Sequence, residues 1–405
     1  MNALVTAAAL LLAQEPAELL KKIDGKDPAA CFRTIAALAE LDAKHRAEIE
    51  KGAASLPEFY RDALLAELRA PAPAKVTLKG AQMPLGKCLE ELTRQAGIPF
   101  DFFASQPGGG ALIDLDLDNV SAYEALAEVC ARGQVTPWWL GYKNAYQVMN
   151  QGPSQRGFAT RNAAMMFSSS YLGRSIVPGR APVSYVGLTF MGASPHGEGI
   201  LGWRGVRVYE ATGDTGAPLA YWAFNADASI APPMDKWLAE YRTWGSYPWF
   251  CLRITDDVKK ISRLRFSIQV RVATKVRTLE LAGPAAEGKA VVKQEGYEAE
   301  VRDIATFGRR FGRLRLRIKA STPELESMLC MLPVKNLLQN EKPGIGSHWA
   351  EPSKVEGGVE YLWTWSGGGD SKAEEVTRPT KITVVLPAAY EDRTIFAEFR
   401  DLQIR

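Results

Sequence analysis

The stretch VTLKGAQMPLGKCLEELTRQAGIPFDF, from Val76 to Phe102, decides how the first half of the chain is interpreted. Its start, Val76 to Leu78, is typical of a strand. Pro84 is a residue that begins helices, and Gly97 is typical of the position just after a helix ends. The segment that follows, Ile98 to Phe102, predicts a second strand. The stretch therefore predicts a strand–helix–strand unit.

The next segment repeats this alternation of strand and helix. Residues 112–120 predict a strand, and Ser121 is a residue type that caps the N-terminus of the helix after it. Two short strands, near residues 138–142 and 146–149, close the segment. The predicted order over residues 73–150 is βαββαβ with one further short strand.

This segment resembles the short N-terminal domain of secretins and TonB-dependent receptors, the STN-like family. The resemblance lies in the opening stretch together with ALIDLDLDNVSAYEALAEVCARGQVTPWWLGYKNAYQVMN. The matching positions form an apolar framework with glycine and serine at its turns: Leu85, Leu89, Leu92, Ala96, Gly97, Val120, Ser121, Ala125 and Leu126. The resemblance implies a periplasmic module for protein interaction or oligomerisation and implies no chemistry. No secretin pore segment and no TonB-dependent plug or barrel follows it.

Residues 14–70 are almost free of strand signals and predict a small helical unit. Asp27 is a typical helix N-cap, and Pro28 suits the first position of the helix. A second apolar stripe contains Phe59, Leu64, Leu65 and Leu68. The unit is similar in shape to one HEAT-like repeat, and a single repeat cannot form a solenoid. The segment APAPAK then predicts a linker before the next domain.

The N-terminal stretch MNALVTAAALLLAQEPA has an apolar run from Ala3 to Ala13. The run is too short to span a bilayer and fits the apolar part of a secretory signal cleaved after Ala13. An ordinary first helix is the alternative. We expect residues 1–13 to be a signal peptide, and the protein to be periplasmic or secreted. No other segment approaches the length of a transmembrane span.

From about Gly152 the chain changes to short strand-like runs separated by turns, which predicts an antiparallel β-sandwich over residues 155–405 with helical and loop insertions. The run STPELESMLCML predicts one helical insertion. In another run arginines alternate with aliphatic residues, which places the two kinds on opposite faces of a strand: Arg313, Leu314, Arg315, Leu316, Arg317 and Ile318. The arginine face is interpreted as a solvated sheet face, with a polyanion site as the alternative.

Composition and cysteine spacing argue against several classes of protein. The net charge of +3 gives no reason to expect nucleic acid as a partner. The 5 cysteines include no CxxC pair and no Cys/His cluster, so no zinc site is predicted. Cys88 and Cys130 lie at helical spacing among leucine and valine and are interpreted as core residues. A disulfide between them is the alternative for an exported chain.

Motifs associated with catalysis fail on their context. Gly197, Gly199 and Gly202 match GxGxxG, but a strand-like run follows where a dinucleotide site needs a helix. DLDLDN, from Asp114, has neither the glycine nor the glutamate of a calcium loop and is typical of a half-buried strand. Two Ser/His groupings lack the nucleophile-elbow pattern: Ser194 with His196, and Ser347 with His348 and Glu351. We therefore predict no enzyme activity, no metal and no cofactor, with a Ser/His or carboxylate hydrolase as the alternative.

An aromatic cluster is the least usual feature of the sequence. Trp237, Tyr241 and Trp244 are spaced four and then three residues apart, so they share one face of a predicted helix. Packing against the sandwich is one interpretation, and a platform for a sugar ring or a partner peptide is the other. The candidate platform consists of Trp222, Trp237, Tyr241, Trp244 and Trp249.

The sequence as a whole predicts an exported α+β protein made of a helical unit, an STN-like module and a β-sandwich. The predicted function is non-enzymatic: interaction with an envelope protein partner, or self-association, through residues 73–150. The alternative is carbohydrate or peptidoglycan binding through the aromatic cluster.

Overall fold

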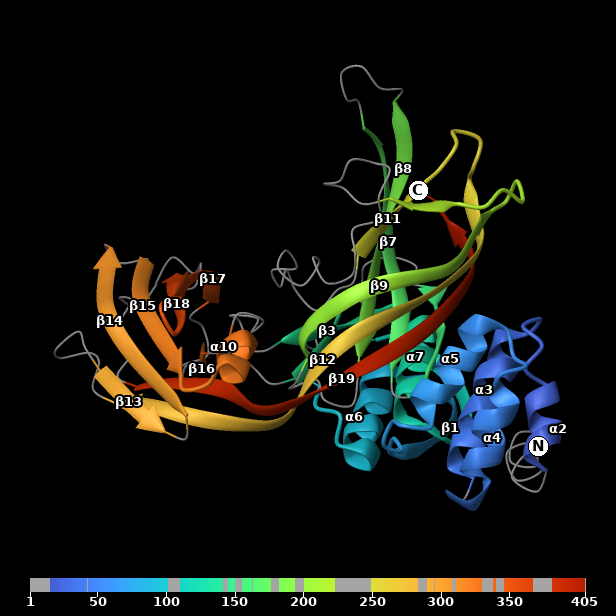
Figure 1. Ribbon diagram of the computed structural model, residues 1–405, viewed down its shortest axis with the longest axis horizontal. Helices are drawn as coiled ribbons and strands as arrows, with labels where there is room; N and C mark the ends of the chain where they lie inside the picture. The colour runs from blue at the N-terminus through green and yellow to red at the C-terminus, as the bar shows by residue number, and fades with distance from the viewer. Residues whose placement is uncertain are drawn as a thin grey trace.

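The structure is a computed structural model that describes residues 15–41, 43–100, 110–140, 145–149, 155–161, 163–175, 182–193, 200–222, 249–282, 290–294, 296–307, 311–329, 338–339, 346–366 and 381–404. It combines helices with several antiparallel sheets, which confirms the predicted α+β class. Two lobes are connected by a pair of long strands, and both the helical unit and the module of residues 73–150 lie in the larger lobe (Figure 1).

The N-terminal unit is helical, as predicted. The Asp27 carboxylate accepts hydrogen bonds from the amides of Ala29 and Ala30, and Pro28 occupies the first helical position. The unit's core is formed by buried side chains such as Leu19, Ile35 and Leu64, which pack against one another. Its helices are α2 (Pro16–Lys21), α3 (Pro28–Glu40), a 3₁₀ turn (Ala43–His45), α4 (Arg46–Ala53) and α5 (Glu58–Glu67).

The described residues between 75 and 149 form strands and helices in the predicted order, with one difference. The Ser121 hydroxyl caps its helix by accepting from two amides, and Gly97 ends the other helix at a φ of 69°. The second strand, predicted over 98–102, is reduced in its described part to one parallel bridge between Phe100 and Tyr146, where Pro99 has no amide hydrogen to donate. The elements are β1 (Lys75–Pro84), α6 (Leu85–Ala96), β2 (Leu112–Ser121), α7 (Ala122–Gly133), β3 (Thr136–Leu140) and β4 (Ala145–Met149).

The module is built around its two helices. The β1–β2 pair and the β3–β4 pair form separate two-stranded sheets, and buried residues of both sheets and of α6 and α7 belong to one apolar core. Leu85, Cys88, Leu89 and Leu92 are the buried stripe of α6. The core also includes Ala164 and Met166 from the sheet that follows, so the module is packed onto the rest of the chain.

Within its described residues, the region after residue 155, predicted as one β-sandwich, contains three five-stranded sheets. In the first, the strand order is β10 (Ala220–Trp222), β11 (Trp249–Arg253), β8 (Val183–Ala193), β7 (Ala164–Ser175) and β5 (Gln155–Arg156). In the second it is β16 (Leu338–Gln339), β19 (Lys381–Gln403), β12 (Lys260–Ala282) and β9 (Ile200–Gly213), with β6 (Phe158–Ala159) beside β19. These two sheets face each other across a core in which Phe190 lies 4.8 Å from Phe266 and 5.0 Å from Phe399, between ring centroids.

The third sheet belongs to the smaller lobe. Its order is β13 (Ala290–Gln294), β14 (Tyr297–Phe307), β15 (Phe311–Ala320), β18 (Gly358–Ser366) and β17 (Gly346–Val355), and the predicted helical insertion is α10 (Pro323–Leu329). Its core includes Leu279 and Leu281 from the far end of β12, and Val384 and Leu386 from the near end of β19.

Strands β12 and β19 therefore serve both lobes. Each has 23 residues, which at about 3.3 Å per residue spans about 75 Å. They pair antiparallel from Lys260 opposite Gln403 to Ala282 opposite Lys381. Register shifts around Lys275 separate the part that packs in the larger lobe from the part that packs in the smaller one. Figure 1 shows the pair running between the lobes as a curved ribbon.

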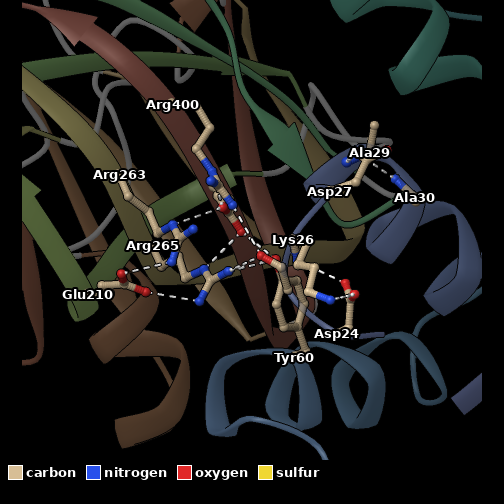
Figure 2. Close-up of polar contacts among 12 residues, drawn as sticks. Asp24, Lys26, Asp27, Ala29, Ala30, Tyr60, Glu210, Arg263, Arg265 and Arg400 are labelled. Carbon is tan, nitrogen blue, oxygen red and sulfur yellow. Dashed lines mark hydrogen bonds and ion pairs between the residues drawn. The ribbon is translucent and has the colours of Figure 1, made fainter. Parts of the chain in front are cut away.

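A buried charge cluster fastens the helical unit to the second sheet (Figure 2). Glu398 is fully buried, and register places Arg265 opposite it on β12 and Glu210 opposite Arg265 on β9. Arg265 donates to both carboxylates at 2.9 Å, and Arg400 donates to Glu398 at 2.6 Å. Tyr60 of α5 donates to Glu398 at 2.5 Å. Two carboxylates are thus held among arginines and a tyrosine hydroxyl.

The same cluster also holds the loop before α3. Arg265 and Arg400 both donate to the carbonyl of Gly25, at 3.1 and 3.2 Å. Burial, followed by the hydrogen bond to Glu398, raises the pKa of Tyr60 far above its ordinary value, so its hydroxyl keeps the proton that it donates. The cluster connects helices and strands that are distant in sequence.

A second buried ion pair links the helical unit to the module. Arg161 and Glu67 have side chains that are 6% and 2% exposed, and their nearest nitrogen and oxygen are 2.6 Å apart. Arg161 also lies 3.6 Å from Glu40, and its carbonyl accepts from the hydroxyl of Ser121. Ser121, which caps α7, is therefore bonded to Arg161, the ion-pair partner of Glu67 on α5.

We expect removal of the Glu398 charge to destabilise the protein strongly. Glu398→Gln leaves buried guanidiniums without their carboxylate, which typically costs about 3–5 kcal/mol. Tyr60→Phe removes one hydrogen bond to a charged group, which is worth about 1.5–3 kcal/mol. Urea unfolding of both variants measures these losses, with Lys21→Ala on an exposed ion pair as the matched control. Unfolding of Glu398→Gln at the wild-type urea concentration would contradict this role.

Candidate functional site

The β1–β2 sheet is the first candidate interaction surface. Side chains along both strands alternate between buried and exposed, so one face packs on the helices and the other is polar. The DLDLDN run behaves as predicted: Ile113 and Leu115 are buried, whereas Asp114 and Asp116 are exposed. The run is a half-buried strand.

The outer edge of β1 is closed by a side chain of its own module. The Gln95 amide of α6 accepts from the Thr77 N–H at 2.9 Å and donates to the Thr77 carbonyl at 3.0 Å. These are the two bonds that a neighbouring strand would make with Thr77. Gln95 therefore satisfies the exposed backbone at this position, as proteins commonly do to protect a sheet edge.

The outer edge of β2 is more open. Within the described part of the chain, no strand pairs with β2 on the side away from β1. Arg132 of α7 donates to the Asp114 carbonyl at 2.5 Å. Among the described residues, the carboxylate of Asp116 has no hydrogen-bond or ion-pair partner, whereas Asp118 lies 3.0 Å from the Lys79 ammonium. Hydrogen bonds from Gln82, its backbone N–H first, hold the pKa of Asp114 below its ordinary value.

The predicted aromatic platform is described only in part. Trp222 lies in β10 and Trp249 in β11, which are neighbouring strands of the first sheet. Trp237, Tyr241 and Trp244 lie outside the described residues. The platform as a whole stays a prediction.

The same sheet contains two tyrosines that the sequence reasoning missed. Tyr171 on β7 lies opposite Gly187 on β8, and Tyr185 lies opposite Gly173. A Cβ on Gly187 would lie 2.1 Å from the Tyr171 ring, and a Cβ on Gly173 would lie 2.2 Å from the Tyr185 ring, so each ring covers a glycine. The signal was present as a repeated Ser-Tyr-x-Gly, in SYLG and SYVG. Tyr171 remains 42% exposed.

The register extends this aromatic row across the sheet. Tyr171, Gly187, Cys251 and Trp222 occupy successive opposite positions on β7, β8, β11 and β10. The Tyr171 hydroxyl lies 3.7 Å from the Cys251 sulfur. An exposed tyrosine thus shares its row with one residue of the predicted platform.

The catalytic alternatives gain no geometric support. Ser194, His196, Gly197 and Gly199 lie outside the described residues, and Ser347, His348 and Glu351 occupy positions along β17. Gly202 lies in β9, the strand that was expected where a dinucleotide site needs a helix. Across the described ranges, no group of three His, Cys, Asp or Glu side chains is arranged to hold a metal ion.

One hollow of about 330 Å³ lies between α5 and the middle of β19. Three of the four acidic residues that line it have cationic partners: Glu67 pairs with Arg161, Glu391 with Arg393, and Asp62 with Arg61. Paired carboxylates are poorly suited to act as a general acid or base. The hollow is a junction between the helical unit and the ribbon.

The arginine strand has the alternation that was predicted. Leu314, Leu316 and Ile318 of β15 are fully buried. On the other face Arg315 lies 3.4 Å from Glu360, and Arg317 donates to the carbonyl of Glu356. Contacts of this kind suit a solvated sheet face better than the alternative of a polyanion site.

Cys88 and Cys130 are both buried and both free, so the disulfide considered as an alternative is not formed. Burial is the largest cause of the rise in their thiol pKa values, which for Cys88 reaches about 11. Both are core residues of the helix pair, as the leucine and valine spacing indicated.

The chain matches no family model, no curated protein and no solved structure. The resemblance to STN-like domains therefore rests on the residues quoted for it and stays a prediction. No helix in the described part of the chain has the length and apolar character needed to cross a membrane.

We expect Cys88 to be a protected thiol. Native protein treated with iodoacetamide at pH 8 will be modified slowly at Cys88, and urea-unfolded protein rapidly, as read by peptide mass spectrometry. The unfolded thiol loses its proton near its ordinary pKa of 9.0, whereas the folded thiol has a pKa of about 11. The stability that comes from burying the neutral Cys88 thiol is therefore full below pH 9 and is lost as the pH rises toward 11. A peptide pair linked through Cys88 and Cys130 would contradict the assignment.

Proposed function

We propose that the protein is a non-enzymatic, exported envelope protein that binds a protein partner, or a second copy of itself, through the module of residues 73–150. The supporting observation is the outer edge of β2, which has no paired strand within the described residues. A strand edge of this kind offers main-chain donors and acceptors that another extended segment can use.

The way the module is anchored supports the same proposal. Arg156 of β5 makes ion pairs with Glu124 and Glu128 of α7, and Ser121 is bonded to the carbonyl of Arg161. These contacts use the helix and the end of β2. They leave the middle of β2, where Asp114 and Asp116 are exposed, available to a partner.

We expect a photo-cross-linking residue at position 116 of the full chain to capture one protein, or a second copy, in cells. The matched position is Lys293, an exposed residue on β13 of the smaller lobe. The intact mass of the tagged chain recovered from the envelope fraction tests export, which predicts a mature N-terminus at Gln14. Identical products from positions 116 and 293, or none, would remove the support for the module as the binding site.

A second candidate is carbohydrate or peptidoglycan binding on the first sheet. The observation that favours it is the exposed ring of Tyr171, which covers Gly187 in the row that includes the Trp222 position. Exposed aromatic rings suit contact with the apolar face of a sugar.

If the first sheet binds glycans, co-sedimentation with peptidoglycan and a glycan array will detect it, and Tyr171→Ala will lose the binding. Leu172→Ala is the matched control, because Leu172 is the next residue, is 57% exposed and belongs to the opposite face of the sheet. Equal losses in the two variants, or no binding by the wild type, would exclude this candidate.

A further inference from the structure

We propose that the edge of β2 binds an extended segment of a partner protein that carries lysine or arginine at alternate positions, added as a third strand to the β1–β2 sheet. This inference rests on the proposed function and names the partner's chemistry. It follows from which edge is open, from which backbone groups point outward, and from the charges beside them.

The two edges of the β1–β2 sheet differ in how far they are already occupied. On β1, Gln95 occupies both the N–H and the carbonyl of Thr77, so an incoming strand would have to break two hydrogen bonds there. On β2, among the described residues, Arg132 is the one side chain that contacts an outer backbone group, the Asp114 carbonyl. The Arg132 side chain is 48% exposed and also pairs with Glu128, so it can move to that partner alone. The β2 edge is the easier one to extend.

The register of the β1–β2 pair determines which backbone groups of β2 point to the open side. Thr77 turns its N–H and carbonyl away from β2, and backbone groups alternate along a strand, so Lys79 does the same. Lys79 is the register partner of Asp116, and Leu78 pairs with Leu117 beside it without a shift. In an antiparallel pair, two directly opposite residues either both point their N–H and carbonyl toward the partner strand or both point them away from it. Because Lys79 points these groups away from β2, Asp116 points its N–H and carbonyl away from β1, to the open side.

The charged side chains beside the β2 edge are acidic. Asp114 and Asp116 are exposed, and a strand added beyond β2 would have them as direct cross-strand neighbours. The lysines of the sheet, Lys75 and Lys79, lie on β1, one strand farther from the newcomer. Opposite charges that face each other across strands are favourable, and like charges are unfavourable. The edge therefore selects a segment with basic residues at the positions facing Asp114 and Asp116.

The start of β2 adds an apolar position. Leu112 is 55% exposed and has the same parity along the strand as Asp114 and Asp116. A bound segment thus meets an apolar residue followed by two carboxylates on the outward face. This order sets its register.

A second copy of β2 fits this edge poorly. In a two-fold antiparallel pair centred on Asp116, that residue would face its own copy. If the centre of the pair moved by one residue, to Leu115, Asp114 would lie opposite Asp116 of the other copy. Both arrangements put like charges in direct cross-strand contact. The charges thus favour a basic partner over self-association through β2.

The test uses the full chain and a defined probe: a fluorescein-labelled peptide of about ten residues that alternates lysine with valine, with the glutamate–valine peptide as its control. Fluorescence anisotropy measures the dissociation constants. We expect the lysine peptide to bind, the glutamate peptide not to bind, and added salt to weaken binding. Asp116→Lys should weaken binding by about tenfold or more, and Asp116→Pro, which removes the outward N–H donor, should abolish it.

Glu90→Lys is the matched variant, since it makes the same charge change on an exposed residue of α6 in the same module. Equal weakening by Glu90→Lys and Asp116→Lys, or equal binding of both peptides, would overturn the inference. Cross-linking from position 116 separates the two levels of the proposal. A partner captured there without a basic strand overturns the charge rule and leaves the proposed function standing, whereas no capture overturns both.

Discussion

The arrangement of the larger lobe depends on the hydrogen bonds and ion pairs of one buried carboxylate, that of Glu398. It lies in a row that crosses three strands, from Glu210 through Arg265 to Glu398, and it accepts a hydrogen bond from the Tyr60 hydroxyl of the helical unit. A buried charge of this kind is tolerable only when its partners are in place. The helices and the sheet must therefore be assembled together for either to be stable at this contact.

The second sheet is a middle layer between the helical unit and the first sheet. One face of β12 and β19 carries Arg265, Glu398 and Phe396 toward the helical unit, and the other carries Phe266 and Phe399 into the core shared with the first sheet. The two strands then continue into the smaller lobe, where Leu279 and Leu386 join its core. The Arg161–Glu67 pair extends this framework to the module of residues 73–150. The polar face of β1–β2 is thus presented on a rigid support.

Local signals in the sequence predicted local structure well. Asp27, Gly97 and Ser121 each define a helix end through bonds or φ values within a few residues, and all three were predictable from residue type. The Glu398 cluster was not predictable, because Tyr60 and Glu398 are 338 positions apart and neither has a local pattern that names the other. The closing of the β1 edge was hidden in the same way, since Gln95 reaches Thr77 only after α6 has packed against the sheet.

The sequence predicted which module carries the candidate site, residues 73–150, but it did not predict which strand edge of that module is open. The sequence indicated where β2 runs and that its aspartates face solvent. The aromatic hypothesis pointed to the first sheet through Trp222 and Trp249, yet the exposed ring that the structure describes is Tyr171. Its repeated Ser-Tyr-x-Gly acquires meaning only when the register places each tyrosine opposite the glycine of the other strand.

The difference between the two edges of the β1–β2 sheet is the central claim, and amide hydrogen exchange of the purified full chain tests it most directly. The Thr77 amide, bonded to Gln95, should exchange slowly, whereas the Asp116 amide should exchange at a rate close to that of an exposed loop. An Asp116 amide as well protected as that of its neighbour Leu117 would mean that the β2 edge is already occupied, and would contradict the account.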